Sequence, residues 1–273
     1  MQPIFPAIII YKCRLQEAES YNSFIKANEF ERFFVYDNSP GDYAQEDVAK
    51  LYPGVIYVRD EANSGLPKAY NLAAQKAKEL SCKRLILLDQ DTHFPQEALQ
   101  AYLDAQDFDG ITAPRIITTL GKPFAPANLT VWYPTPTHLP AGEYSLYKYM
   151  TVNSGLCIPV ELFLQAGGYN ENVRLDFADF QFQRRVRKVN PRLLLLPITL
   201  QQDYSGDCHD LQKQMVRFGL YLESALHCET EGFSDELSHH YTVLRRTLSL
   251  TLHNQSPAFL KAYFSQFLWQ RLG

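Results

Sequence analysis

The sequence lacks the features that mark several large classes of protein. Its formal net charge is −4, so no overall basic field favours a nucleic-acid partner. No stretch reaches the roughly 18 to 20 consecutive apolar residues that a membrane-spanning helix requires. The cysteines are widely spaced, without a Cys-x-x-Cys pair, so neither a disulfide framework nor a thiolate metal site is expected. A reducing cytoplasm fits this pattern best.

The N-terminal segment has no basic leader, and Pro3 and Pro6 interrupt its apolar run. We therefore expect a first strand there and not a signal peptide. No internal repeat or low-complexity tract is present, while 46% of the 273 residues are hydrophobic and 21% are charged. This composition is typical of a globular protein with a large core.

The order of the predicted elements indicates the fold class. Runs typical of buried strands occupy 6–11, 32–39, 55–60, 84–89 and 108–117, and helical spacing occupies 17–30, 66–80 and 95–105. Strands that are apolar on both faces and separated by helices predict a parallel sheet covered on each side. We expect an α/β nucleotide-binding domain over 1–206 and a helical extension over 207–273, with helices at 210–228, 236–254 and 257–272.

Two aspartates end the fourth predicted strand. Alternate residues of a strand point to the same side, so Asp89 and Asp91 can approach one ion. Two carboxylates beside phosphate oxygens suit Mg²⁺ or Mn²⁺. Without a cation their repulsion would cost about 1 kcal/mol or more. The alternative is that both are ordinary turn residues after a strand.

Polar residues also follow the second and third predicted strands. Asp37 could accept a hydrogen bond from the N3–H of uracil or thymine, although Asp-Asn-Ser is also good turn chemistry. Gly65 stands at the start of the helix over 66–80, where free backbone N–H groups favour phosphate. Helix capping alone would also explain this glycine and Pro67.

In this order and spacing the segments resemble glycosyltransferase family 2. The motifs are "AIIIY", "VYDNS", "NSGLPKAYNLAAQKA", "LLLDQDT", "NSGLCIP", "GGYNENVRLDFADFQFQRR" and a final "SGD". They cover most of the chain from residue 7 to about 207, and within the family they are most similar to the rhamnosyltransferase-like branch. The resemblance implies a GT-A fold, which is an α/β fold with a mostly parallel sheet flanked by helices, followed here by a helical C-terminal extension.

The resemblance also implies a role for each matching residue. Asp37 would read the pyrimidine base, and Asp89 would lie near the ribose and diphosphate. Asp91 would be the principal ligand of Mg²⁺ or Mn²⁺. Asp179 would be the catalytic base, with Asp176 as its local rival. The remaining nucleotide-sugar-binding residues would be Asn63, Gly65 and Asn71 at the floor of the site, and Asn153, Ser154 and Gly155 beside the sugar.

The implied reaction is transfer of a sugar from a dTDP- or UDP-sugar, with L-rhamnose as the leading candidate, to a hydroxyl of a glycan or lipid-linked glycan. A single displacement with a carboxylate as general base would invert the anomeric centre. From the residues alone, the segment around Asp176 and Asp179 also fits the start of a surface helix, with acids near its positive end. Only the resemblance favours catalysis there.

The sequence departs from the family pattern at several positions. Gln181 replaces an acid that is common in relatives, and Lys12 replaces an asparagine after the first strand. Asp203 stands where relatives often have a metal-binding histidine, so we expect Asp203 as a metal ligand, with His209 as a substitute. These changes keep open a catalytically silent GT-A domain that binds a nucleotide or glycan. A metal-dependent nucleotidyltransferase is a weaker third reading, since the glycine-rich first loop is missing.

The C-terminal segment carries an apolar stripe at helical spacing. Its members are Phe259, Leu260, Tyr263, Phe264, Phe267 and Leu268. We expect the stripe to pack within the protein. A peripheral contact with the inner face of the membrane and a homodimer are both left open, and Arg245 and Arg246 could meet a pyrophosphate-linked acceptor or form an exposed basic face.

Overall fold

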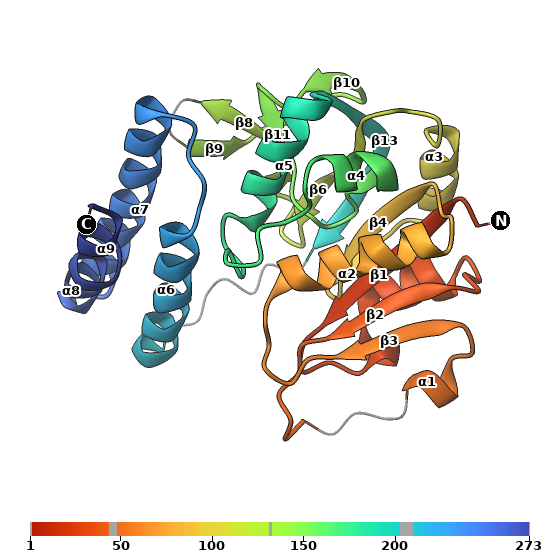
Figure 1. Ribbon diagram of the computed structural model, residues 1–273, viewed down its shortest axis with the longest axis horizontal. Coiled ribbons are helices and arrows are strands. Elements are labelled where there is room, and N and C mark those ends of the chain that lie inside the picture. The colour runs from red at the N-terminus through yellow and green to blue at the C-terminus, as the bar shows by residue number, and fades with distance from the viewer. Residues whose placement is uncertain (1, 44–47, 131–132, 203–209, 273) are drawn as a thin grey trace.

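The computed structural model describes residues 2–43, 48–130, 133–202 and 210–272. In this part of the chain, ten strands form one large sheet and three form a small one (Figure 1). The strands of the large sheet are β1 (Ile4–Ile10), β2 (Phe33–Asp37), β3 (Val55–Arg59), β4 (Arg84–Asp89), β5 (Thr92–His93), β6 (Ile111–Thr118), β7 (Pro123–Ala125), β10 (Gly142–Ser145), β12 (Cys157–Pro159) and β13 (Arg192–Gln202). The small sheet contains β8 (Ala127–Thr130), β9 (Tyr133–Pro136) and β11 (Tyr149–Met150).

The helices fall into two groups. Those of the sheet-containing part are η1 (Leu15–Glu17), η2 (Tyr21–Lys26), α1 (Val48–Leu51), α2 (Leu66–Glu79), α3 (Ala98–Asp104), α4 (Val160–Gln165) and α5 (Ala178–Val189). The C-terminal helices are α6 (Leu211–Leu226), α7 (Phe233–His253), α8 (Ala258–Ala262), η3 (Tyr263–Leu268) and α9 (Trp269–Leu272). Among the described residues, no helix is both long enough and apolar enough to cross a membrane.

The large sheet is mostly parallel and is buried on both faces. Its order is β10-β13-β6-β12-β4-β1-β2-β3. β1 pairs in parallel with β2 and β4, and β13 pairs in parallel with β6, whereas β12 runs antiparallel between β4 and β6. Phe5 and Ile9 of β1 face the core under α2, α4 and α5, while Ile4 and Ile8 face the core over η2 and α3. This alternation explains why the strand is apolar at every position.

The α/β class and the helices at 66–80 and 95–105 are confirmed, but two local expectations were wrong or incomplete. The segment 17–30 is not one α-helix: it forms η1 and then the wider π-helical turns of η2. The Asn22 and Asn28 amides donate there to backbone carbonyls, which competes with regular helix hydrogen bonding. The sequence reading did not single out β13, whose register with β6 shifts between Leu195 and Thr199, around Pro197.

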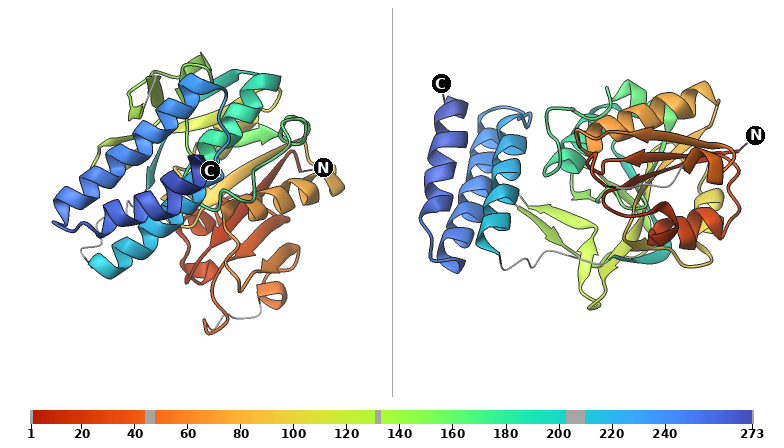
Figure 2. Two further views of the ribbon diagram at one scale, coloured as in Figure 1. Left: turned by 60° about the vertical axis from the view of Figure 1, so that its left-hand side comes forward. Right: turned by 90° about the horizontal axis from the view of Figure 1, so that it is seen from below.

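The C-terminal helices build a core of their own. Phe218 and Leu222 of α6, Val243 of α7 and Phe259 of α8 are buried together. Of the predicted apolar stripe, Phe259, Tyr263 and Phe267 are buried, whereas Phe264 is exposed. Figure 2 shows these helices as a separate layer beside the sheet-containing part. The predicted division at residue 206 falls in 203–209, outside the described residues, and stays a prediction.

A buried arginine ties together strands β4, β6 and β12. Only 2% of Arg84 is exposed, and its guanidinium donates to the carbonyl oxygens of Phe108, Gly110 and Cys157 and to the hydroxyl of Thr112. Carbonyl oxygens thus replace the water around this cation. Loss of the guanidinium would leave several buried acceptors without donors, each at a cost of about 1 to 3 kcal/mol.

We predict that Arg84→Met lowers the free energy of unfolding by roughly 3 to 5 kcal/mol, because buried carbonyls lose their donors together. Urea denaturation followed by circular dichroism measures the change. The control is Lys83→Met, which removes an exposed cation one residue away and should change stability by about 0.5 kcal/mol or less. Equal stability of the two variants would contradict the structural role of Arg84.

Candidate active site

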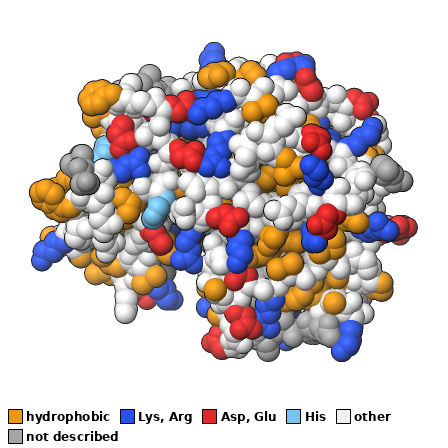
Figure 3. Space-filling view, in the orientation of Figure 1, with side chains coloured by type: hydrophobic (Ala, Val, Ile, Leu, Met, Phe, Trp, Pro, Cys, Tyr) orange, Lys and Arg blue, Asp and Glu red, His pale blue; other side chains and the backbone are white. Residues whose placement is uncertain are grey.

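The strand ends bring the predicted acids to one edge of the sheet. Asp89 at the end of β4 is in register with Ile9 of β1, and Asp37 at the end of β2 is in register with Ile10. Gln202, the last residue of β13, pairs with Thr92 of β5. In the orientation of Figure 1, the surface is notched between the C-terminal helices and the sheet-containing part (Figure 3). In parallel α/β sheets, ligands bind beside the carboxyl ends of the strands, where these residues lie.

Asp89 is held by donors from distant parts of the chain. Its Oδ1 accepts from the hydroxyl of Tyr70 on α2 (3.2 Å), and its Oδ2 accepts from the hydroxyl of Ser154. Thr92 in turn donates to Ser154 (3.2 Å). Burial raises the pKa of Asp89, while the hydrogen bonds from Ser154, Tyr70 and Gln202 act to lower it. Asp89 is therefore a fixed acceptor in a polar network.

Gln202 lies between the two aspartates of the motif. Its Nε2 is 3.4 Å from Asp89 Oδ2 and 3.3 Å from Asp91 Oδ1, and both distances are long for hydrogen bonds. Its Oε1 is buried and has no hydrogen-bond partner among the described residues. One amide thus lies near two carboxylates, while no described residue pairs with its own oxygen. An unpaired buried oxygen is unfavourable, so this arrangement has a reason to change when a cation binds.

These residues fit a small divalent cation. A half-turn of the Gln202 amide would exchange its nitrogen for its oxygen, since the two ends have the same shape. Oxygens of Asp89, Asp91 and Gln202 would then face one point, and such oxygens are the ligands that Mg²⁺ and Mn²⁺ prefer. Within the described ranges, no group of three or more His, Cys, Asp and Glu side chains forms a metal site. The predicted ligand Asp203 and its substitute His209 lie outside those ranges.

Asp179 lies in the first turn of α5, and its Oδ1 accepts from the N–H of Phe180 (2.9 Å). Burial raises the pKa of Asp179 to about 7, and the negative charges of Asp176 and Asp89 add to the rise. A carboxyl group with a pKa near the working pH is well suited to general base catalysis. Asp176, its rival in sequence, instead forms an ion pair with Arg217 of α6.

The Asn-Ser-Gly turn before β12 lies against the same network. Asn153 accepts from the hydroxyl of Tyr169 (2.6 Å). Gly155 has φ +73°, and a Cβ there would lie 2.9 Å from side-chain atoms of Tyr102, Pro114 and Leu200. A larger residue would therefore displace the turn that presents Ser154 to Asp89.

The loop before α2 is fastened to the segment that leads into α5. Gly65 has φ +102°, and a Cβ there would lie 2.4 Å from the carbonyl oxygen of Arg174. That oxygen accepts from the N–H of Leu66 (3.2 Å), and Arg174 donates to the carbonyl of Asn63. The amide of Asn71 is bonded to the backbone N–H and carbonyl of Tyr169. These predicted floor residues thus position the α2 and α5 loops relative to each other.

Two aspartates, Asp37 and Asp60, lie where the sequence predicted contact with the pyrimidine base of the nucleotide. Asp37 is fully buried and accepts from the N–H of Ser39 (2.9 Å) and the hydroxyl of Tyr57 (2.7 Å). Asp60, which the sequence reading missed, directly follows β3 and accepts from Tyr36 (2.8 Å). Burial of Asp60 favours its neutral form, but hydrogen bonds from Ser64 and Tyr36 outweigh burial and lower its pKa. Asp60 is a strand-end acid like Asp37, so the same signal could have found it.

A cavity of about 510 Å³ adjoins Asp91. Its lining residues are Cys13, Glu17, Glu19, Gln90, Asp91, His93, Thr119 and Gln201. The volume is within the range of small-molecule sites.

The curled, mostly parallel sheet flanked by helices matches the GT-A class of fold. Residues 8–152, more than half of the 273, match the family model described as glycosyl transferase family 2. The chain belongs to that family. A search of curated protein sequences found no match.

Solved structures of glycosyltransferases share the fold at low sequence identity. The chain is similar to GalNAc-T7 in complex with UDP, GalNAc and Mn²⁺, with a TM-score of 0.56 and 14% identity. This match covers 97% of the present chain and 56% of the GalNAc-T7 chain, so the present chain spans little more than half of that relative. It is also similar to residues 1–349 of S. aureus TarS (TM-score 0.54, 14% identity, 96% and 79% of the chains covered) and to their complex with UDP-GlcNAc (TM-score 0.53, 14% identity, 96% and 79% covered).

We predict that Gln202→Leu weakens Mn²⁺ binding by about tenfold or more, because it removes the amide oxygen that would join Asp89 and Asp91 as a ligand. Gln202→Glu should lower stability without metal, since a third negative charge joins Asp89 and Asp91, and should give a larger Mn²⁺-induced rise in Tm than the wild type. Thermal unfolding with and without MnCl₂ measures both effects.

The matched control is Gln96→Glu, which places the same charge on an exposed residue that does not line the cavity beside Asp91. It should leave the Mn²⁺-induced shift near that of the wild type. If Gln202→Leu binds Mn²⁺ as tightly as the wild type does, Gln202 is not a ligand.

Proposed function

We propose that the protein is an inverting glycosyltransferase that moves a sugar from a UDP- or dTDP-sugar to a hydroxyl of a glycan or lipid-linked glycan. The single observation that carries the proposal is that two different acid environments lie within electrostatic reach of each other, one at the end of β4 and one in the first turn of α5. Asp89 and Asp91 face a common amide, whereas Asp179 stands apart with a pKa near 7. Family membership and the fold shared with enzymes solved with UDP, UDP-GlcNAc or Mn²⁺ support it.

The acids would divide the chemistry between them. A divalent cation, when bound by Asp91, Asp89 and Gln202, would neutralise the charge that develops on the leaving diphosphate. Asp179 would accept the proton of the acceptor hydroxyl as its oxygen attacks the anomeric carbon. The bond from that carbon to the diphosphate breaks in the same step, and its electron pair leaves with the phosphate. Because Asp179 Oδ1 accepts from Phe180, we assign the proton to Oδ2.

The finer parts of the proposal rest on the resemblance. These finer parts are that the sugar is L-rhamnose, that the product is a cell-surface polysaccharide, and that the protein acts in the cytoplasm or at the inner face of the membrane. The exposed apolar side chains of α7 are compatible with a peripheral membrane contact or a homodimer. They include Phe233, Leu237, Tyr241 and Leu252. Asp203 is our proposed further metal ligand.

We predict slow, Mn²⁺- or Mg²⁺-dependent release of nucleoside diphosphate from at least one sugar in a UDP- and dTDP-sugar panel. Asp91→Ala should reduce this release about 100-fold or more, since the cation loses its principal ligand. Asp107→Ala, which removes an exposed aspartate after α3, is the control and should retain activity. Nucleotide binding in calorimetry without turnover of any donor would instead favour the catalytically silent binding module.

We predict that Asp179→Asn retains donor binding and lowers transfer to acceptor by about 10²- to 10⁴-fold, because an amide cannot take the proton. Transfer and donor affinity are measured separately, by product formation and by calorimetry. Unchanged transfer would assign the base to another group.

We predict that the rate of the wild type falls as the pH decreases through about 7, because the base must be ionised. The raised pKa can also be tested without measuring activity, because it makes the free energy of unfolding depend on pH. The pKa of Asp179 is higher in the folded than in the unfolded chain, so its contribution to stability decreases as the pH rises from about 4 to 7. Asp179→Asn should therefore gain stability relative to the wild type over this interval in urea denaturation; a constant difference would contradict the raised pKa.

A further inference from the structure

The segment that leads into α5 bridges the two parts of the molecule. On one side, Arg174 is bonded through its carbonyl to Leu66 and through its guanidinium to Asn63, both in the loop that begins α2. On the other side, Asp176 and Phe177 contact the C-terminal helices. Asp179 follows directly, so its position depends on both attachments.

Arg217 of α6 makes the polar attachment. Its Nη1 and Nη2 donate to both carboxylate oxygens of Asp176, with 3.0 Å between Nη2 and Oδ1. A guanidinium that binds a carboxylate with two nitrogens fixes orientation as well as distance. The same contact compensates the charge of Asp176, which would otherwise act more strongly on Asp179.

Phe177 makes the apolar attachment in a strained conformation. Its ring lies 5.1 Å from that of Tyr221 on α6 and 5.2 Å from that of His239 on α7. It also packs against the core of the sheet-containing part. The residue has φ +68°, in the left-handed region, and it is the N-cap of α5. A large side chain adopts this conformation only where its surroundings hold it there.

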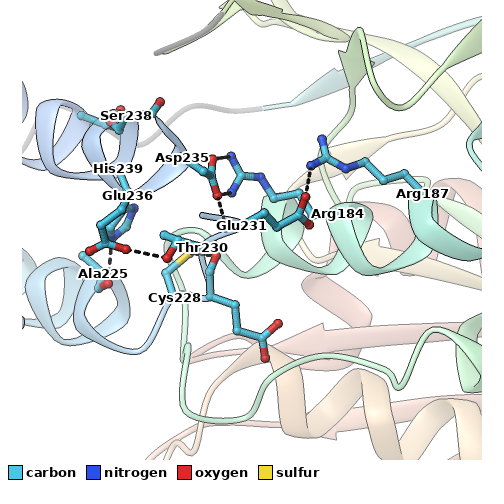
Figure 4. A network of polar contacts seen from close by, with 12 residues as sticks. Arg184, Arg187, Ala225, Cys228, Thr230, Glu231, Asp235, Glu236, Ser238 and His239 are labelled. Atoms are coloured by element: carbon cyan, nitrogen blue, oxygen red, sulfur yellow. Dashed lines mark hydrogen bonds and ion pairs between the residues drawn. The ribbon is translucent and has the colours of Figure 1, made fainter. Parts of the chain in front are cut away.

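The remainder of α5 forms ion pairs with the start of α7 and with the loop before it (Figure 4). Both Nη atoms of Arg184 lie 2.6 Å from the carboxylate oxygens of Asp235. Arg187 pairs with Glu231 (2.8 Å), one turn further along the helix. The C-terminal part therefore contacts α5 both along the helix and just before it, where Asp176 and Phe177 stand three and two residues before Asp179.

We propose that Arg217 is a positioning residue for sugar transfer: through Asp176, and beside the ring contacts of Phe177, it holds the first turn of α5, and with it Asp179, in the geometry that proton transfer needs. This inference rests on the function proposed above. The pair is partly exposed, with 45% of the Arg217 side chain accessible, and such pairs contribute little to global stability. An effect on the chemical step is thus separable from an effect on folding.

The test is a comparison of Arg217→Met with Lys213→Met, which removes an exposed cation one turn earlier on α6. We expect Arg217→Met to lower kcat for transfer by about 10- to 100-fold, because small displacements of a catalytic group have effects of this size. The KM for the donor should stay within about threefold of the wild type. Arg217→Lys, which keeps the charge but not the two-nitrogen contact, should be intermediate, and Lys213→Met should match the wild type.

A double-mutant cycle with Asp176→Asn tests the route of the effect. If Arg217 acts through Asp176, the double variant should lose no more kcat than the more impaired single variant. Additive losses, an unchanged kcat in Arg217→Met, or a raised donor KM with kcat unchanged would each overturn the proposal.

Hydrogen exchange of residues 174–181 provides a readout that needs no turnover. We expect faster exchange in Arg217→Met than in Lys213→Met, while the global Tm values agree closely. Equal exchange in the two variants would overturn the positioning role. Absence of turnover by the wild type on every donor would overturn the proposed function instead, so the two failures are distinguishable.

Discussion

The chemistry of this protein depends on how negative charge is compensated at one edge of a buried sheet. Asp89 and Asp179 are close enough for their charges to interact, and burial makes the ionised form of each costly without a partner. Asp89 receives hydrogen bonds from Tyr70, Ser154 and Gln202. Asp179 receives a backbone N–H from Phe180, and its pKa rises to about 7. The charges of these aspartates are thus compensated by different sets of hydrogen-bond donors, and we propose different roles for them.

The partners of these acids come from every layer of the fold. Tyr70 belongs to α2, Ser154 to the turn before β12, and Gln202 to the end of β13. The ring of Tyr169 stacks on Phe182 of α5 at 4.1 Å, and its hydroxyl reaches Asn153. The hydrogen-bond donors to these acids are therefore held in place, because the residues that carry them also pack or hydrogen-bond elsewhere in the fold. The buried oxygen of Gln202 is the exception, and it marks the point where a cation would improve the hydrogen-bonding balance.

The C-terminal helices also contact the helix that carries Asp179. They bury their own aromatic core, yet they also form ion pairs with α5 along its length and contact Phe177 at its start. Surface ion pairs of this kind add little to stability. In the proposed function their value would lie in orientation, since the helix that carries Asp179 would have to be fixed relative to the sheet edge at Asp89.

Much of the fold could be read from the sequence. Strands apolar at every position and separated by helices specify a doubly covered sheet, and parallel strands place their terminal residues at one edge. Asp37, Asp89 and Asp91 were found in this way, and Asp60 could have been. The irregular turns of η2 were not predictable, because they depend on asparagine side chains bonding to particular carbonyls. β13 was missed because Pro197 interrupts it.

By itself, then, the sequence determined the layer order, the family motifs and the identity of the acids. Only the tertiary structure decided the surroundings of each acid. Tyr70, Ser154 and Gln202 stand 19, 65 and 113 residues from Asp89 in the chain, so no local pattern predicts that they contact it, although Ser154 lies in one of the family motifs. Hydrogen-bond partners and burial set the protonation of a carboxyl group, and both arise from contacts that exist only after the chain has folded.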